Sequence, residues 1–250
     1  PRVFEKVYAG VVAKAEAGSP LKKKIFHWAV GVGKEMSRLK QARKPIPGGL
    51  AFKGRLAHKL VFSKMHAALG GRLRFAVSGG APLSREIAEF FGAAGMLVCE
   101  GYGLSETSPV ITCNFPGRVK PGTVGLPLEH VEVRIAADGE ILTRGPHVMK
   151  GYFRKPEATA EAIEKDGWFH TGDIGFVDAD GCLVITDRKK DIIVTSGGKN
   201  IAPQPIESRL KTSKFIAEVV MIGNQRNPAA ALVVPGFEAP ISLVYSSRNR

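Results

Sequence analysis

Apolar positions divide the chain into two parts with different periodicities. In residues 2–17, and again after Pro20, apolar side chains recur every three or four residues, which predicts two amphipathic helices. A third helix is expected after the Pro/Gly break at residues 44–49. Its apolar side is expected to consist of four residues: Leu56, Leu60, Met65 and Leu69. From residue 73 onward, short apolar runs separated by Gly-rich turns replace this pattern and predict strands.

The first of these runs, LRFAV at residues 73–77, is expected to be a buried strand that leads into the Gly-rich turn SGGAP. A helix, LSREIAEFF, follows with Ser84 as its N-cap, and the next strand is MLVCE. The order strand, helix, strand is typical of a parallel β/α unit, whose ligands bind at the carboxyl ends of the strands. SGGAP and the loop GYGLSETSPV at residues 101–110 both follow such ends, so we expect them to face one site.

After residue 120 the pattern predicts antiparallel hairpins. Asp-Gly turns join VEVRIA to ILTR and IGFVD to CLVIT, and a short helix at residues 156–164 lies between the two hairpins. A small α+β unit is expected to open near residue 190, with a helix beginning near Pro205 and the strand IAEVVMIG after it. The segment TDRKKD separates this unit from the second hairpin.

The net charge of +13 lies in one segment of the chain. Residues 1–72 hold 16 Lys and Arg against three acidic residues, whereas residues 73–250 hold 20 of each sign. The simpler interpretation is that these charges solvate helix faces. The alternative is attraction to an anionic membrane surface or to polyphosphates. Nucleic acid is not expected as a partner, because no base-stacking or groove-reading motif accompanies the charge.

Cysteine usage and hydropathy indicate the cellular compartment in which the protein is expected. Cys99, Cys113 and Cys182 have no paired or metal-ligand spacing, and no signal peptide is recognisable. Such a sparse, odd set is typical of a reduced cytoplasmic protein. No apolar run approaches the ~18 residues of a membrane span. We expect a cytoplasmic protein, with a peripheral position at the inner face of the membrane as the alternative.

The loop GYGLSETSPV carries more polar groups than a turn requires. Its carboxylate, Glu106, stands beside several hydroxyl groups at the end of a predicted strand. Carboxylate oxygens are ligands that Mg²⁺ prefers, and the hydroxyl of Ser105 can donate to a phosphate oxygen. This loop therefore predicts a site for a Mg²⁺-bound phosphate.

Five motifs occur in a fixed order along the chain: SGGAP, GYGLSET, GEILTRGPHVMKGY, GWFHTGD, and DRKKD followed by SGGKNI. Together they resemble the adenylate-forming (AMP-dependent) ligases, which include acyl-CoA synthetases, luciferases and peptide-synthetase adenylation domains. PRVFEKV at the start and AVSGGAP make the bacterial long-chain fatty acid–CoA ligases the nearest resemblance. The similarity extends from residue 1 to about residue 225.

The resemblance implies an α/β fold in three parts. Residues 1–72 would form a basic helical segment of the large adenylate-forming domain. Residues 73–188 would form its nucleotide- and acyl-binding part, a parallel β/α unit with antiparallel hairpins. Residues 189–250 would contain the hinge and the start of a small α+β C-terminal domain.

The resemblance also implies residue roles around the phosphates and the adenine. Tyr102, with Gly103 beside it, would bind the nucleotide by packing on adenine. Ser105 would contact the α-phosphate and Glu106 would reach Mg²⁺, so these two are the implied catalytic residues. The turn between adenine and the acyl carboxylate would consist of Gly79, Gly80, Ala81 and Pro82.

Further implied contacts come from the later motifs. Asp173 would bind the two ribose hydroxyls, which suits a carboxylate acceptor. Arg188 would make a second ribose or phosphate contact, and Lys190 would be the hinge about which the small domain rotates. Gly197 and Gly198 match the segment that meets the pantetheine arm of CoA.

The implied function is ATP-dependent activation of a fatty acid to acyl-AMP, followed by thioester formation with CoA. The implied partners are a fatty acid, ATP and CoA, with Mg²⁺ as the metal. Two alternatives stay open. One is another adenylate-forming enzyme, such as a fatty acyl-AMP ligase or an adenylation domain. The other is a non-catalytic remnant that binds nucleotides or a membrane surface through its basic segment.

The sequence also departs from the family pattern. The Ser/Thr/Gly-rich phosphate loop and the C-terminal lysine of the family match nothing in the chain, and the similarity fades after about Pro235. We therefore expect an internal fragment of such an enzyme, inactive by itself.

Overall fold

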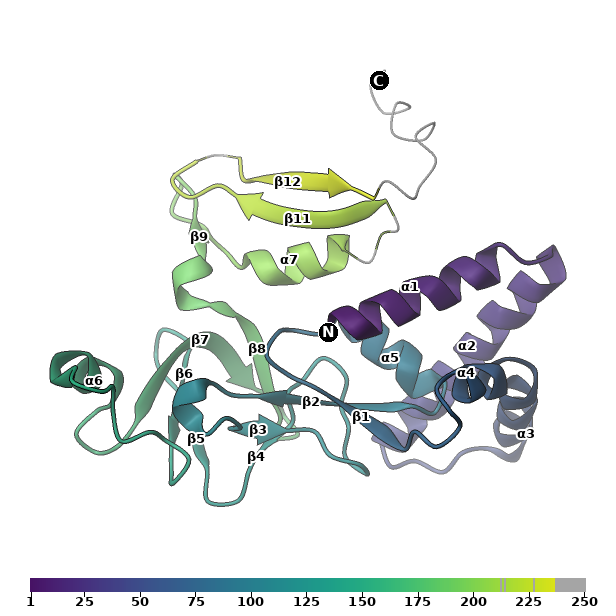
Figure 1. The fold of residues 1–250 in the computed structure, drawn as a ribbon, viewed down its shortest axis with the longest axis horizontal. Coiled ribbons are helices and arrows are strands. Elements are labelled where there is room, and N and C mark those ends of the chain that lie inside the picture. Colours follow the sequence, from purple (N-terminus) through teal and green to yellow (C-terminus); the bar gives the residue numbers. More distant parts are fainter. Residues whose placement is uncertain (212, 214, 227, 237–250) are drawn as a thin grey trace.

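The structure is a computed structural model, and it describes residues 1–211, 213, 215–226 and 228–236. Figure 1 shows a helical block on the right, two sheets in the centre and on the left, and a small C-terminal unit above them. The α/β fold class is confirmed. The segment in which the family similarity is expected to fade, after about Pro235, lies almost wholly outside the described residues.

The helical block begins with the two predicted amphipathic helices, α1 (Arg2–Glu16) and α2 (Pro20–Gln41). The third helix is divided into α3 (Gly48–Ala57), a π-helical turn (His58–Phe62) and α4 (Ser63–Ala68). Because a π-turn adds a residue to the helical repeat, it shifts the apolar face. The predicted apolar side is therefore wrong for three of its members, since Leu56, Leu60 and Leu69 are exposed and Met65 alone is buried.

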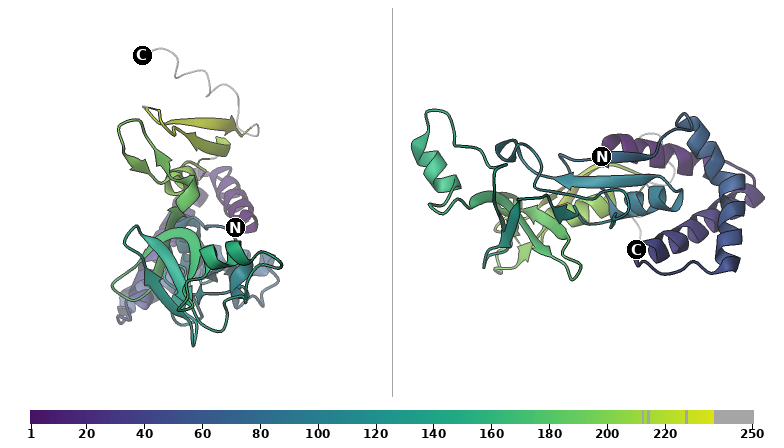
Figure 2. Two further views of the ribbon diagram at one scale, coloured as in Figure 1. Left: turned by 90° about the vertical axis from the view of Figure 1, so that its left-hand side faces the viewer. Right: turned by 90° about the horizontal axis from the view of Figure 1, so that it is seen from below.

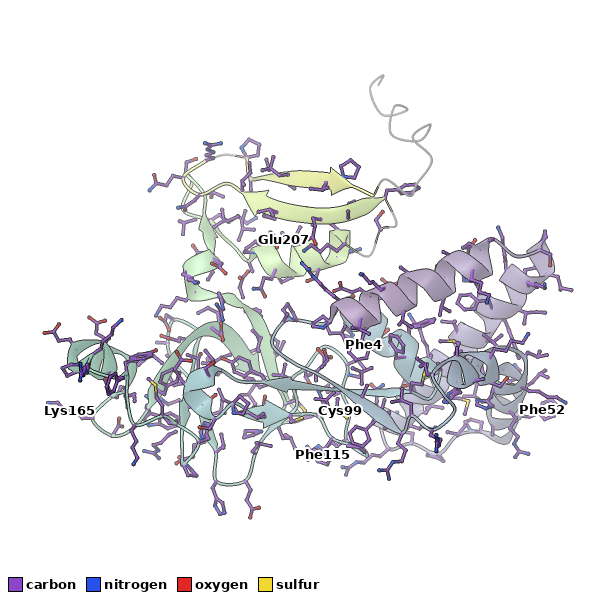
Figure 3. All side chains as sticks on the ribbon, in the orientation of Figure 1. Phe4, Phe52, Cys99, Phe115, Lys165 and Glu207 are labelled. Carbon is purple, nitrogen blue, oxygen red and sulfur yellow. The ribbon has the colours of Figure 1, made fainter. Side chains whose placement is uncertain are left out.

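The main core lies between this block and α5 (Arg85–Ala93), which begins after Ser84 as predicted. Phe4 of α1, labelled in Figure 3, packs edge-on against Phe91 of α5 with ring centroids 5.6 Å apart. Gly33 allows α2 to approach α5 closely, because a Cβ there would lie 2.3 Å from the carbonyl oxygen of Ala93. These contacts fix α5 against one face of the central sheet.

The central sheet has the order β1-β2-β3-β4, formed by β1 (Phe75–Ser78), β2 (Leu97–Tyr102), β3 (Thr112–Cys113) and β4 (Leu126–Pro127). β1 and β2 are parallel, which confirms the β/α unit. The prediction that β1 is buried is wrong, because β1 lies at the edge of the sheet and Val77 is 63% exposed. A strand with one neighbour leaves part of its apolar surface uncovered.

The second sheet is antiparallel, with the order β5-β6-β7-β8, and it unites both predicted hairpins. Its strands are β5 (Glu132–Ile135), β6 (Glu140–Arg144), β7 (Phe169–Val177) and β8 (Leu183–Arg188). The predicted helix is present as α6 (Pro156–Ala162), which projects away from the sheet on the side opposite the helical block (Figures 1 and 2).

The C-terminal unit follows β8 through a 3₁₀ turn (Lys189–Asp191). It contains β9 (Ile193–Val194), β10 (Asn200–Ile201), α7 (Pro203–Leu210), β11 (Ile216–Ile222) and β12 (Ala230–Pro235). The predicted α+β character is present, and α7 begins close to the expected residue. Figure 1 shows this unit above the sheets, and the N–H of Gln204 in α7 donates a hydrogen bond to Oδ2 of Asp187 in β8 at 3.2 Å. Among the described residues, no helix is long and apolar enough to cross a membrane.

Candidate functional site

The two sheets meet where several predicted site residues lie. The carboxyl ends of β1 and β2 share one edge, because the strands are parallel and Ser78 pairs with Glu100. Tyr102, at the end of β2, donates a hydrogen bond from its hydroxyl to Oδ2 of Asp173 in β7, at 2.7 Å. This bond joins residues 71 positions apart in the chain and closes one wall of a cavity.

We call this cavity the inner cavity; its volume is about 420 Å³. Of the predicted site residues, it is lined by Gly80, Ala81, Pro82, Tyr102, Gly103, Asp173 and Arg188. The turn after β1, the end of β2 and the β7–β8 pair thus converge on one cavity, as the motif positions predicted.

A second, more open cavity of about 730 Å³ lies beside it, and we call it the outer cavity. The predicted site residues that line it are Gly103, Ser105, Glu106, Arg188 and Lys190. Gly103 and Arg188 border both cavities, so the two form one continuous site with an inner and an outer end.

Asp173 is a buried and hydrogen-bonded polar group of the inner cavity. It is 5% exposed, and its second carboxylate oxygen, Oδ1, accepts a hydrogen bond from Nε of Arg188 at 3.1 Å. Burial, together with the nearby Asp173 carboxylate, raises the pKa of Tyr102, so that its hydroxyl stays a donor. Because each carboxylate oxygen has two lone pairs, Asp173 can still accept further hydrogen bonds from a ligand.

The backbone of the TGD motif holds Asp173 in a β-bulge. Glu140 pairs with Ile174 and Leu142 pairs with His170, so Ile141 alone spans the part of β6 that faces residues 171–173 of β7. The hydroxyl of Thr171 donates to the carbonyl of Ile141 at 2.7 Å and accepts from the N–H of Asp173 at 3.1 Å. Bulges of this kind change the direction in which a side chain points.

The sequence analysis missed several polar residues that line the inner cavity: Ser78, Glu100, Thr123, Asp187, Asp191 and Gln204. Glu100 in β2 is 7% exposed, and burial raises its pKa to about 7 despite hydrogen bonds from the N–H groups of Gly122 and Leu83. The Oγ of Ser78 is buried and has no hydrogen-bond partner within the described residues. One signal for Glu100 was available in the sequence, because this acidic residue directly follows the apolar run MLVC of a predicted strand. Acidic residues are almost never buried without a partner, so an acid in such a position indicates a special role.

The loop after β2 shapes the outer cavity. Gly103 lets the loop fold back on itself, because a Cβ there would lie 1.7 Å from the carbonyl oxygen of Pro109. The hydroxyl of Thr107 bonds the backbone of Leu104 and fixes the 3₁₀ turn that carries Ser105 and Glu106. Ser105 is exposed on this turn.

Within the part of the chain that the structure describes, Glu106 has one side-chain partner, the hydroxyl of Tyr152, which donates to Oε1 at 3.0 Å. The described residues contain no group of three or more His, Cys, Asp or Glu side chains that could hold a metal ion. A metal ion held here would therefore take Glu106 from the chain and further oxygen ligands from phosphates and water. Mg²⁺ is commonly bound in this way. The geometry of Glu106 fits such a site.

Three predicted residues lie outside the linings of both cavities. Gly79 precedes Gly80 in the turn after β1, but only Gly80 lines the inner cavity. Gly197 and Gly198 are exposed in the loop between β9 and β10 of the C-terminal unit. Their binding roles remain predictions from the resemblance.

Comparisons with known proteins identify the family of this chain. The sequence profile described as AMP-binding enzyme matches residues 21–153, and the profile described as AMP-binding enzyme C-terminal domain matches residues 190–243. The predicted resemblance to the AMP-dependent ligases is confirmed.

Among curated relatives, the long-chain-fatty-acid–CoA ligase FadD15 of Mycobacterium bovis is 45% identical over 96% of this chain and 39% of its own length. Long-chain-fatty-acid–CoA ligase 5 of Rattus norvegicus is 37% identical over 96% of this chain and 35% of its own length. The chain thus spans about two fifths or less of the length of these relatives.

A solved structure extends the similarity to three dimensions. The O-succinylbenzoate coenzyme A synthetase of Bacillus subtilis, in complex with ATP and magnesium ion, matches with a TM-score of 0.58 and 31% identity. The match covers 69% of this chain and 40% of that chain.

Proposed function

Because the chain belongs to the AMP-binding enzyme family, we propose that the whole protein containing these residues is a long-chain fatty acid–CoA ligase. It would join a fatty acid to ATP as acyl-AMP and then transfer the acyl group to CoA. The observation that carries this proposal is the convergence of Tyr102, Asp173 and Arg188 on the inner cavity, which opens at Gly103 and Arg188 toward Glu106.

The inner cavity would hold the adenosine part of ATP. The ring of Tyr102 forms a wall for the base, and the free lone pairs of Asp173 would accept from the two ribose hydroxyls. Glu100 and the hydroxyl of Ser78 would meet the polar edge of the base. An ionised Glu100 can accept from the exocyclic amino group of adenine, which guanine lacks at that position.

The outer cavity would hold the phosphates. Arg188, Lys189 and Lys190 line it with positive charge, and Ser105 can donate a hydrogen bond to a phosphate oxygen. Mg²⁺ bound to Glu106 would neutralise charge that develops on the departing pyrophosphate.

Two bond exchanges then complete the reaction. The fatty-acid carboxylate oxygen attacks the α-phosphorus and the bond to the β-phosphate oxygen breaks, which releases pyrophosphate. The CoA sulfur next attacks the acyl carbon, loses its proton to solvent or a base, and displaces AMP. A rotation of the C-terminal domain about Lys190 would present a different face of that domain to the acyl-AMP in each of the two steps.

The choice of a long acyl chain and of CoA is supported by the names of the relatives, which are long-chain-fatty-acid–CoA ligases. The runner-up functions are a fatty acyl-AMP ligase and an adenylation domain, which share the first step and differ in the acceptor. The test is to supply the whole protein with ATP, Mg²⁺ and palmitate, and to follow radiolabelled pyrophosphate exchange into ATP and, with CoA added, palmitoyl-CoA formation.

Palmitate-dependent exchange followed by thioester formation is the expected result. Exchange without thioester would favour a fatty acyl-AMP ligase. If pyrophosphate exchange does not depend on any fatty acid, the proposed function is wrong, and a non-catalytic nucleotide-binding role takes its place.

We also propose that the whole protein is cytoplasmic and contacts anionic membranes through the helical block. Residues 1–72 carry the entire net charge of +13, and they include the exposed apolar side chains of Leu21 and Phe52. Basic residues beside exposed apolar ones favour an anionic lipid surface.

The measurement for this contact is co-sedimentation of the whole protein with vesicles of phosphatidylserine and phosphatidylcholine at two salt concentrations. Reversing Lys22, Lys24 and Lys44 to Glu should lower binding to anionic vesicles roughly 100-fold or more, since each Lys near the surface contributes about 1 kcal/mol. Reversing Lys150, Lys155 and Lys165, which are exposed outside this block, is the matched control. Equal losses in both sets would show that the helical block is not the contact surface.

A further inference from the structure

Glu140, the first residue of β6, is a buried carboxylate whose two oxygens serve different parts of the molecule. Oε1 accepts a hydrogen bond from the backbone N–H of Gly172 at 2.9 Å. Oε2 accepts one from Nζ of Lys189 at 2.9 Å, and Nδ1 of His170 lies 3.2 Å from the same oxygen. The side chain of Glu140 is only 6% exposed, so these contacts decide its orientation.

The Oε1 contact replaces a backbone bond that the β-bulge removes. Residues 171–173 of β7 have a single opposing residue in β6, so the ladder cannot satisfy every N–H of the bulge. Gly172 has φ +71, and its N–H donates to the Glu140 side chain. The next residue is Asp173, whose side chain faces the inner cavity. The bond to Glu140 therefore holds the backbone directly before Asp173.

The Oε2 contact reaches the segment that precedes the hinge. Nζ of Lys189 also lies 2.7 Å from Oδ2 of Asp138, so the ammonium group bridges two carboxylates of the β5–β6 hairpin. Asp138 and Glu140 raise the pKa of Lys189 to about 12. Burial by itself would raise the pKa of Glu140, but the hydrogen bonds from Lys189, His170 and Gly172 lower it overall. Both partners are charged near neutral pH.

We propose that Glu140 is a positioning residue that couples the ribose-binding bulge to the hinge of the enzyme. The contact of Oε1 with Gly172, which we call the ribose arm, orients Asp173 toward the ribose hydroxyls. The contact of Oε2 with Lys189, which we call the hinge arm, holds Lys189 to the large domain, so that rotation is confined to the residues after Lys189. This inference rests on the proposed function, because it needs an adenosine ligand and a rotating C-terminal domain.

The ribose arm can be tested by comparing ATP with 2′,3′-dideoxy-ATP in the pyrophosphate-exchange assay on the whole protein. Glu140→Ala should raise the KM for ATP about 5- to 10-fold, the effect expected when a buried donor loses its acceptor. With 2′,3′-dideoxy-ATP, the KM values of wild type and variant should agree within about twofold, because no ribose hydroxyl then reaches Asp173.

Two conservative variants separate positioning from folding. Glu140→Gln keeps an oxygen acceptor for Gly172 and should restore the KM for ATP to within about twofold of the wild type. Glu140→Asp keeps the charge near Lys189 but withdraws the oxygen from Gly172, so its KM for ATP should rise as in Glu140→Ala. Glu140→Asp also serves if Glu140→Ala does not fold.

The hinge arm is tested with Lys189→Met, which leaves the bond between Glu140 and Gly172 in place. Because Lys189 also lines the outer cavity, the readout is the ratio of the two half-reactions rather than the KM for ATP. This variant should lower thioester formation at least ~3-fold more than acyl-AMP formation, because the pivot loses its anchor. Lys165→Met is the matched control, since Lys165 is exposed far from the hinge.

The outcomes separate this inference from the proposed function. If the wild type shows no palmitate-dependent exchange, the proposed function fails. If the wild type is active and Glu140→Asp raises the KM for ATP and for 2′,3′-dideoxy-ATP equally, or raises neither, Glu140 does not position the ribose site. If Lys189→Met lowers the rates of acyl-AMP formation and thioester formation equally, Lys189 does not anchor the hinge.

Discussion

The inner and outer cavities differ in how their polar groups are held. In the inner cavity, Asp173 is fixed by Tyr102 and Arg188, and Glu100 is buried among backbone N–H groups. In the outer cavity, Ser105 is exposed and Glu106 has one neutral side-chain partner, Tyr152. The proposed adenosine end is thus organised without a ligand, whereas we expect the proposed phosphate end to become organised by its ligand and metal.

This difference assigns different energetic roles to the two ends. Preorganised contacts that are the same in the ground state and the transition state contribute affinity but do not speed the chemical step. Groups that meet charge developing during the reaction act on the rate. Substitutions in the inner cavity should therefore change nucleotide affinity and stability, and those in the outer cavity should change turnover.

The largest effect is expected at Glu106. Glu106→Ala should lower acyl-AMP formation by the whole protein roughly 10²-fold or more, because a metal contact to the phosphates is lost. The check is palmitate-dependent pyrophosphate exchange, with Glu161→Ala on the exposed face of α6 as the matched control. Near-normal exchange in Glu106→Ala would remove the metal-binding assignment.

The next effect concerns stability rather than turnover. The pKa of Glu100 is raised from 4.5 in an ordinary glutamate to about 7 in the folded protein, mainly by burial. Protonated Glu100 therefore contributes to the free energy of unfolding. This contribution is fully present below pH 4.5 and is lost as the pH rises through about 7. Glu100→Gln cannot ionise, so it should escape this loss.

Urea unfolding at pH 5 and pH 8 measures the difference. Relative to Glu100→Gln, the wild type should lose about 2 kcal/mol of unfolding free energy between these two pH values. Glu161→Gln, an exposed substitution, should change in parallel with the wild type. If the unfolding free energies of wild type and Glu100→Gln change by the same amount between the two pH values, burial does not raise the pKa of Glu100.

A smaller effect is expected at the hinge. Lys190→Pro restricts the backbone where rotation should occur, so it should lower thioester formation about tenfold more than acyl-AMP formation. Lys190→Ala keeps the backbone free and should alter the ratio of the two rates by less than about threefold. Equal losses in both half-reactions of Lys190→Pro would show that Lys190 has a structural role only.

The parts of the fold that the sequence predicted well are those with local signals. The β1–α5–β2 unit was predicted from apolar runs and a helix start at Ser84, and the hairpins from Asp-Gly turns. Each depends on periodicity or turn chemistry within about ten residues.

The parts that escaped prediction depend on distant contacts. The π-turn at His58–Phe62 leaves no mark in the apolar pattern, and the exposure of Val77 follows from the place of β1 at the sheet edge. Glu140 sits within a recognised motif, but its bonds to Gly172 and Lys189 join segments 32 and 49 residues away. Only the folded chain reveals such a contact.

The central claim is that the described residues bind adenosine through the inner cavity independently of the phosphate end. The most direct test is calorimetric titration of the whole protein with AMP without Mg²⁺, for wild type, Asp173→Asn and Glu106→Ala. Asp173→Asn should weaken AMP binding about tenfold, equivalent to ~1.4 kcal/mol, while Glu106→Ala should stay within about twofold of the wild type. If Glu106→Ala weakens AMP binding as much as Asp173→Asn does, or if Asp173→Asn binds AMP normally, the division into two functional ends is contradicted.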